Sequence, residues 1–180
     1  MKATGIVRRI DDLGRVVIPK EIRRTMRIRE GDPLEIYTDH EGEVIFKKYS
    51  PIGELTGVAA GYAESINKTC GLSVVIIDRD MVIACAGMPK KDIMEHRISS
   101  EMEDIIESRQ LYSWQQGGKK IPLIDKQDKY YTSSSMPIFT EGDIIGAIAV
   151  ISDENLKVSG ETEIKLIQTA AIFLGKQLEA

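Results

Sequence analysis

Residues 8–24 read RRIDDLGRVVIPKEIRR and decide how the N-terminal part of the chain folds. Two runs rich in β-branched residues flank the turn signal DDLG at 11–14, and Pro19 opens a short stretch that ends near Met26. This pattern predicts strands over 5–10 and 15–18, a turn between them, and a short helix with Pro19 at its first position.

The basic residues of this segment are spread over both predicted strands and the predicted helix, so they can share one surface. Binding a phosphate backbone and reading base edges both require such a surface. Residues 1–29 carry a net charge of +6, whereas residues 30–180 carry −10. On a charged face that is only solvated, basic residues alternate with acidic ones, as they do in this chain after residue 30. We therefore expect contact with double-stranded DNA from Arg8, Arg9, Arg15, Arg23 and Arg24.

Two other residues of the segment are suited to shaping this site without touching DNA. Gly14 can adopt the positive φ that a tight turn requires, which holds Arg15 close to the strand that carries Arg8. Pro19 has no amide hydrogen to leave unpaired at a helix start. We expect Gly14 and Pro19 to support the site structurally.

A second hairpin follows, with strands over 34–38 and 44–48. We expect a first domain over 1–50, then a linker over 51–55 that leads into a helix. About fifty residues of mostly strand bury too little apolar surface to be stable alone. The sequence therefore predicts an obligate dimer in which strands are exchanged between protomers.

The rest of the chain, residues 54–180, alternates helices and hairpins. Ser50 and Pro51 form a helix start, and Ser100 with Glu103 forms a capping box. The predicted elements are a helix to Lys68, a hairpin over 72–86, a helix over 99–108, an irregular segment over 109–129, a hairpin over 130–152 and a helix over 160–178. This order predicts an α+β fold, an antiparallel sheet with helices packed on it. The last helix is apolar around much of its girth, so we expect the first and last helices to pack against copies in another chain.

Five short stretches of the first fifty residues carry a family resemblance: KATGIVR (2–8), DLGRVVIP (12–19), EIRR (21–24), LEIY (34–37) and KKY (47–49). They resemble the AbrB-type transition-state regulators. The resemblance implies a swapped-hairpin β-barrel made by two interleaved chains, with DNA-binding arginines on one face. Arg8, Arg15, Arg23 and Arg24 fall on matching basic positions, and Arg9 lies where the family also tends to be basic.

Residues 54–180 resemble a GAF domain by the order of their elements, not by a catalytic or cofactor signature. Both halves together resemble a family of late-sporulation regulators. This implies a transcription activator and repressor, and a homotetramer of DNA-binding dimers joined through GAF dimers. GAF domains often bind small molecules beside the segment that crosses the sheet, here about 87–129. A pocket and a core have the same lining chemistry, so both interpretations stay open for Met88, Met94, Met102, Tyr112 and Trp114.

No constellation of residues indicates catalysis or a cofactor. His40 and His96 have no second ligand type at metal-binding spacing. Surface carboxylates give no assignable general acid or base. We expect Cys70 and Cys85 both to be buried structural thiols. We therefore expect no metal, no cofactor and no enzymatic activity.

Two other classes of protein remain as alternatives. The swapped-hairpin fold also serves antitoxins of the MazE type, which carry a disordered tail that wraps a toxin; here an ordered pattern replaces the tail. Redox enzymes of GAF type that act on oxidised methionine depend on several cysteines around one pocket, and this chain has two.

The sequence shows no sign of export or membrane insertion. The first residues carry no apolar run of a secretory signal. The longest apolar stretches, 72–77 and 144–151, are too short to cross a bilayer. We expect a cytoplasmic, nucleoid-associated protein.

Overall fold

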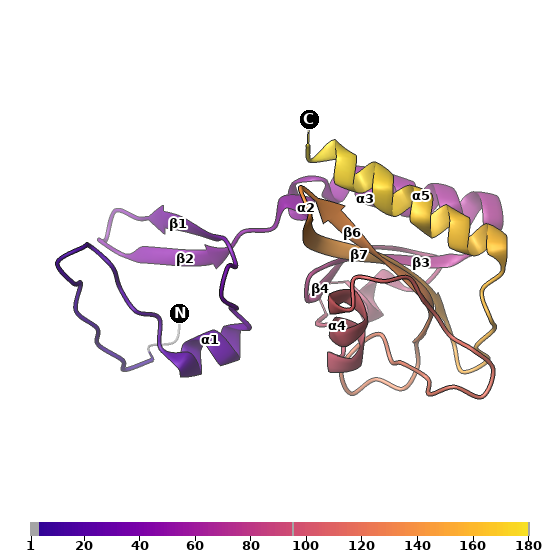
Figure 1. Ribbon diagram of the computed structural model, residues 1–180, viewed down its shortest axis with the longest axis horizontal. Helices are drawn as coiled ribbons and strands as arrows, with labels where there is room; N and C mark the ends of the chain where they lie inside the picture. Colours follow the sequence, from indigo (N-terminus) through magenta and orange to yellow (C-terminus); the bar gives the residue numbers. More distant parts are fainter. Residues whose placement is uncertain (1–3, 95, 180) are drawn as a thin grey trace. The chain divides into compact units, whose positions relative to one another are not determined.

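The computed structural model describes residues 4–94 and 96–179 (Figure 1). Lys2 and Ala3, which open the N-terminal motif, and Ala180, which ends the predicted second domain, lie outside the described residues. The chain divides into two compact units, one ending at Tyr49 and the other beginning at Ser50. Among the described helices, none has the length and apolar character that a membrane span requires.

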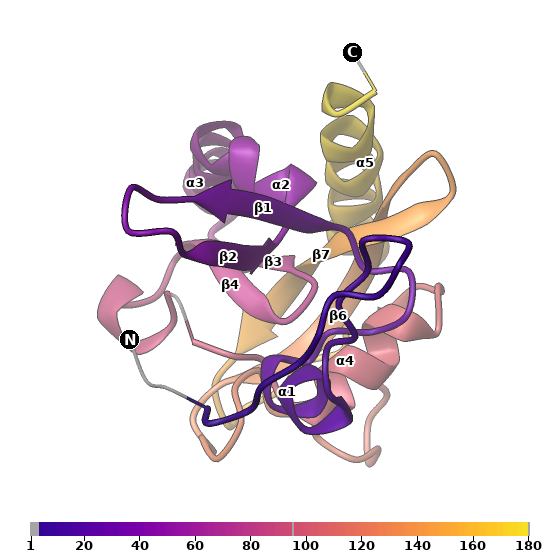
Figure 2. The same ribbon diagram turned by 90° about the vertical axis from the view of Figure 1, so that its left-hand side faces the viewer.

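Unit 1, which ends at Tyr49, contains one short helix and one hairpin (Figure 2). Helix α1 spans Lys20–Met26. Strand β1, Leu34–Thr38, pairs antiparallel with β2, Val44–Lys48, as the sequence predicts. The turn over 11–14 also forms, but the strands predicted over 5–10 and 15–18 do not. A β-strand is defined by its hydrogen bonds to a neighbouring strand. In the described part of this single chain no strand pairs with these two segments, so unit 1 does not close a barrel by itself.

Unit 2, which begins at Ser50, has the helices and hairpins that the sequence predicts. The first predicted helix is broken at Leu55, because α2 ends before it and α3 begins after it. Ser50 Oγ accepts a hydrogen bond from the Gly53 amide at 2.9 Å and caps α2. The elements are α2 Pro51–Glu54, α3 Thr56–Cys70, β3 Ser73–Asp78, β4 Met81–Ala86, the 3-10 turn Lys90–Asp92, α4 Ser100–Glu107, β5 Tyr112–Ser113, β6 Tyr131–Thr140, β7 Asp143–Ser152 and α5 Glu161–Gln177.

The strands of unit 2 form one antiparallel sheet in the order β4-β3-β7-β6-β5. Strand β7 is central and pairs with both β3 and β6. Helices α3 and α5 cover one face of the sheet, and α4 lies on the other (Figure 1). This is the α+β arrangement that the sequence predicts.

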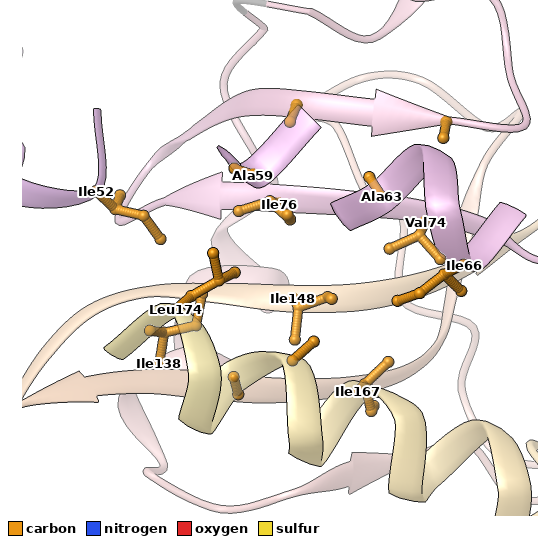
Figure 3. Close-up of a cluster of buried hydrophobic side chains, with 14 of the residues drawn as sticks. Ile52, Ala59, Ala63, Ile66, Val74, Ile76, Ile138, Ile148, Ile167 and Leu174 are labelled. Carbon is orange, nitrogen blue, oxygen red and sulfur yellow. The ribbon is translucent and has the colours of Figure 1, made fainter. Parts of the chain in front are cut away.

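A first cluster of buried side chains fills the space between the sheet and the pair α3 and α5 (Figure 3). Strand residues Ile76 and Ile148 meet helix residues Ala63, Ile167 and Leu174 there, all with side chains that are essentially inaccessible to water. Both helices bury alanines beside larger aliphatic residues, which lets them pack closely on the same sheet face.

A second cluster lies on the opposite face, beneath α4 and the crossing segment. Met102 and Ile106 of α4 are buried there against sheet residues such as Ala149. Ser99 is the N-cap of α4, and its Oγ accepts from the Met102 amide at 3.1 Å. The predicted capping box at Ser100 is therefore wrong by one residue, because Ser99 has the extended backbone that an N-cap needs.

Candidate nucleic-acid interface

The turn at 11–14 fixes where Arg15 leaves the backbone. Asp11 Oδ1 accepts the amides of Leu13 at 3.0 Å and Arg15 at 2.8 Å. The Gly14 amide donates to the Asp11 carbonyl at 3.0 Å, and Gly14 has φ +74°, a value that glycine adopts without strain. The predicted turn and its positive-φ glycine are thus present.

Arg15 then turns its guanidinium back onto Asp11. Its Nε donates to Asp11 Oδ2 at 2.8 Å, while the Arg15 side chain stays 69% exposed. The hydrogen bonds from Arg15 hold the pKa of the Asp11 carboxyl below its ordinary value of 3.8, so this group is ionised at neutral pH. Sequence reasoning overlooked Asp11; an acid four residues before an arginine across a tight turn was the available signal.

Arg23 and Arg24 lie in the last turn of α1 and are both exposed. Basic groups at this end complement the negative pole of the helix. The helix stops at Arg27, which takes the left-handed conformation with φ 50°. Pro19 is the N-cap of α1, with ψ 147°, and not its first helical residue as predicted, because that ψ value lies outside the helical region.

Arg8 and Arg9 precede the turn and are exposed, so all five predicted arginines present their side chains to solvent within unit 1. In the described part of unit 1, only Pro19 is buried. The apolar residues of this unit are instead open to water: Val7 87%, Ile10 69%, Leu13 70%, Val17 70% and Ile36 61% exposed. A unit that leaves its apolar side chains open has no core of its own in the single chain.

The five residues considered for a ligand pocket do not all belong to one cluster in unit 2. Met102 is fully buried in the second cluster, and Met88 and Met94 pack against it, partly buried. Tyr112 is half-buried on β5, and Trp114 is buried, with its indole N–H donating to the Gly118 carbonyl at 3.1 Å. The three methionines thus share one cluster, to which the two aromatic residues do not belong.

The prediction that both cysteines are buried is wrong for Cys70. Cys85 is buried on β4, and burial raises the pKa of its thiol. Cys70 is the last residue of α3 and is exposed, as are all residues over 68–71. Within residues 4–94 and 96–179, no group of three or more His, Cys, Asp or Glu side chains is arranged to hold a metal ion.

Comparison with known proteins matches this division into two units. Residues 54–179 match the family described as "Stage V sporulation protein T C-terminal, transcription factor". Stage V sporulation protein T of Bacillus subtilis (strain 168) is 51% identical over 180 residues, which cover 99% of each chain. The chain belongs to the stage V sporulation protein T family.

The N-terminal part of the chain has further relatives. Residues 7–53 match the family described as "Antidote-toxin recognition MazE, bacterial antitoxin". The transition state regulatory protein AbrB of Bacillus subtilis (strain 168) is 38% identical over 108 residues, 60% of this chain and 96% of that protein. The predicted resemblance to AbrB-type regulators is therefore confirmed.

Unit 2 shares its fold with GAF domains. The GAF domain of a phosphoenolpyruvate-protein phosphotransferase from Coxiella burnetii is 16% identical, with a TM-score of 0.52 over 69% of this chain and 82% of that one. This likeness concerns the fold alone. The predicted GAF resemblance is confirmed, and the stage V sporulation protein T family gives the predicted class of function, a transcription regulator.

Proposed function

We propose that this protein regulates transcription by binding double-stranded DNA through Arg8, Arg9, Arg15, Arg23 and Arg24. The observation that carries the proposal is the exposure of all five arginines in a segment with a net charge of +6, within a chain of net charge −4. Cations held on a folded scaffold displace the counterions of DNA, which supplies sequence-independent affinity. Gly14 and Pro19 act on the site only by shaping the turn and the helix start.

The DNA-binding body is a dimer of residues 1–50. The open apolar residues of unit 1 support this assignment, since a second copy would cover them. The unpaired segments 5–10 and 15–18 support it too, since exchanged strands would supply their missing ladder partners. The result is a closed interchain barrel with the arginines of both copies on it.

The GAF-like domain, residues 54–180, joins two such dimers into a tetramer. Val58 and Tyr62 on α3 and Ile172 and Phe173 on α5 support this role. Val58 is 42% exposed, Ile172 58% and Phe173 38%, and Tyr62 is half-buried. Two linked basic dimers gain affinity for paired DNA sites through their high effective concentration.

A small ligand of the GAF-like domain acts on the geometry of this tetramer. Met88, Met94 and Met102, which belong to the crossing segment and share the second cluster, support this role. The protein has no enzymatic role. Cys70 and Cys85, the residues a GAF-type redox enzyme would need, differ in environment, one exposed and one buried. Residues 50–94 and 96–179 are folded, unlike the tail of an antitoxin of the MazE type.

A salt series tests the DNA site directly. Wild-type protein is titrated onto a short random-sequence duplex beside Arg15→Ala and a matched control, Arg97→Ala, which removes an exposed arginine of unit 2. Four phosphate contacts from the five arginines of each chain make about eight per dimer and give a log–log slope of about −7. Losing two of these contacts reduces the magnitude of the slope to about 5. The control keeps the wild-type slope. Absence of binding at low salt, or equal slopes for Arg15→Ala and wild type, would refute the proposal.

A further inference from the structure

The turn before Arg15 has a second copy in the same unit. Asp39 Oδ1 accepts the amides of Glu41 at 3.0 Å and Glu43 at 2.8 Å. The Asp39 amide donates to the Glu43 carbonyl at 3.2 Å, and the Gly42 amide donates to the Asp39 carbonyl at 3.4 Å. Gly42 has φ +83°. The hairpin turn between β1 and β2 thus repeats the hydrogen bonds of the turn that precedes Arg15.

The two turns differ in the residue that comes directly after the glycine. In the first turn this residue is Arg15, whose Nε reaches Asp11 Oδ2 at 2.8 Å. In the second turn it is Glu43, which repels a carboxylate. The turn therefore needs only one carboxylate oxygen, Oδ1, and the second oxygen of Asp11 is available for a task that the turn itself does not require.

The bond through Nε leaves the far side of the guanidinium open. Within the described residues, the Arg15 side chain has Asp11 as its hydrogen-bond partner, through Nε alone. The two terminal amino groups, Nη1 and Nη2, keep their N–H donors for an acceptor outside the protein, and the side chain is 69% exposed. A guanidinium held at Nε presents a fixed two-pronged donor, the geometry that phosphates and guanine edges accept.

We infer that Asp11 is a positioning residue for DNA binding, which holds Arg15 so that its Nη groups face the DNA. The inference rests on the proposed function. Fixing the side chain before binding reduces the conformational entropy lost on the DNA, since an arginine has many rotamers to give up. The carboxylate occupies Nε and so stabilises one orientation without competing for the Nη donors.

Charge alone predicts that neutralising Asp11 strengthens DNA binding, whereas loss of a positioning residue weakens it. Removing a negative charge from a DNA-binding surface strengthens attraction to phosphates. Loss of affinity on neutralising Asp11 would therefore report the orientation of Arg15 and not the electrostatic field. Asp11→Asn makes this comparison cleanly, because the amide oxygen of asparagine can accept both turn amides, while its NH₂ group cannot accept from Arg15 Nε.

The experiment measures affinity of the full-length protein for one duplex, with Asp39→Asn as the matched control at the other turn. We expect Asp11→Asn to weaken binding about tenfold, and Asp39→Asn to leave binding unchanged. In the Arg15→Ala background, Asp11→Asn has no further weakening effect. The salt slope of Asp11→Asn falls toward that of Arg15→Ala, a change that a purely structural role in the turn would not cause.

Two results would overturn the inference while leaving the DNA site intact. If Asp11→Asn binds like wild type and only Asp11→Ala is weakened, Asp11 serves the turn alone. If Asp11→Asn binds more tightly, Asp11 competes with DNA for Arg15. In both cases Arg15→Ala still lowers affinity and slope. If Arg15→Ala itself has no effect, the proposed function fails instead.

Discussion

The ring of Tyr62 on α3 stacks on the ring of Phe173 on α5, with 5.5 Å between the centroids and 25° between the planes. This stack joins the two helices. Val58 and Ile172, both partly open to water, lie on the same two helices. Aromatic and aliphatic groups exposed together on paired helices are typical of a surface that another protein covers.

Phe173→Asp is expected to split the proposed tetramer into dimers. The carboxylate would be buried without a partner if the helices packed against another copy. Sedimentation velocity should show about half the wild-type mass while circular dichroism remains native. Val158→Asp is the control, since Val158 is 46% exposed on the loop before α5. A Phe173→Asp variant that keeps the full mass would exclude this face as the coupling surface.

Gly175→Ala is expected to destabilise unit 2 by about 2–3 kcal/mol, as overpacking of a close contact does. A Cβ at Gly175 would collide with the backbone oxygen of Phe139 on β6. Thr140 Oγ1 also donates to the Gly175 carbonyl at 3.0 Å, so α5 cannot easily move away. Chemical denaturation measures the loss. Gly61→Ala on α3 is the control and should be neutral or stabilising by up to about 1 kcal/mol, since nothing surrounds its Cβ position.

Met102→Ala tests whether the second cluster is a packed core. Met102 is fully buried against Ile98 and Ile106, and truncation is expected to cost about 2–4 kcal/mol through the cavity left behind. Met88→Ala, at a half-buried position of the same cluster, should cost less than about 1 kcal/mol. Equilibrium unfolding compares the two. A Met102→Ala variant as stable as wild type would mean that this residue borders an open pocket.

The ion pair of Asp92 with Lys129 predicts that the stability of the fold depends on pH in the acid range. Lys129 Nζ donates to Asp92 Oδ2 at 2.9 Å, which holds the pKa of Asp92 below its ordinary value of 3.8. A carboxyl with a lowered pKa contributes stability that is fully present above its unfolded-state pKa and is lost as pH falls through the folded-state value. An NMR titration of Asp92 in Lys129→Met should show its pKa rising toward 3.8. A pKa that does not move would contradict the pairing.

The sequence alone specified the elements that form from neighbours along the chain. The β1–β2 hairpin matches its predicted bounds because the hydrogen bonds that close its turn join residues at most four positions apart in the sequence. The turn at Asp11 is local for the same reason. The alternation of helix and hairpin in unit 2 arises from apolar periodicity, which reports the buried face of each element directly.

Tertiary structure decided what depends on partners far along the chain or outside it. The central place of β7 results from its pairing with β3, some seventy residues earlier, which no local pattern encodes. Cys70, the last residue of α3, is exposed within a run of exposed residues over 68–71, because the helix ends beyond the part that the sheet covers. Segments 5–10 and 15–18 have the residue types of strands, but a strand also needs a ladder, and hydrogen bonds to a partner strand are supplied only by tertiary or quaternary contacts.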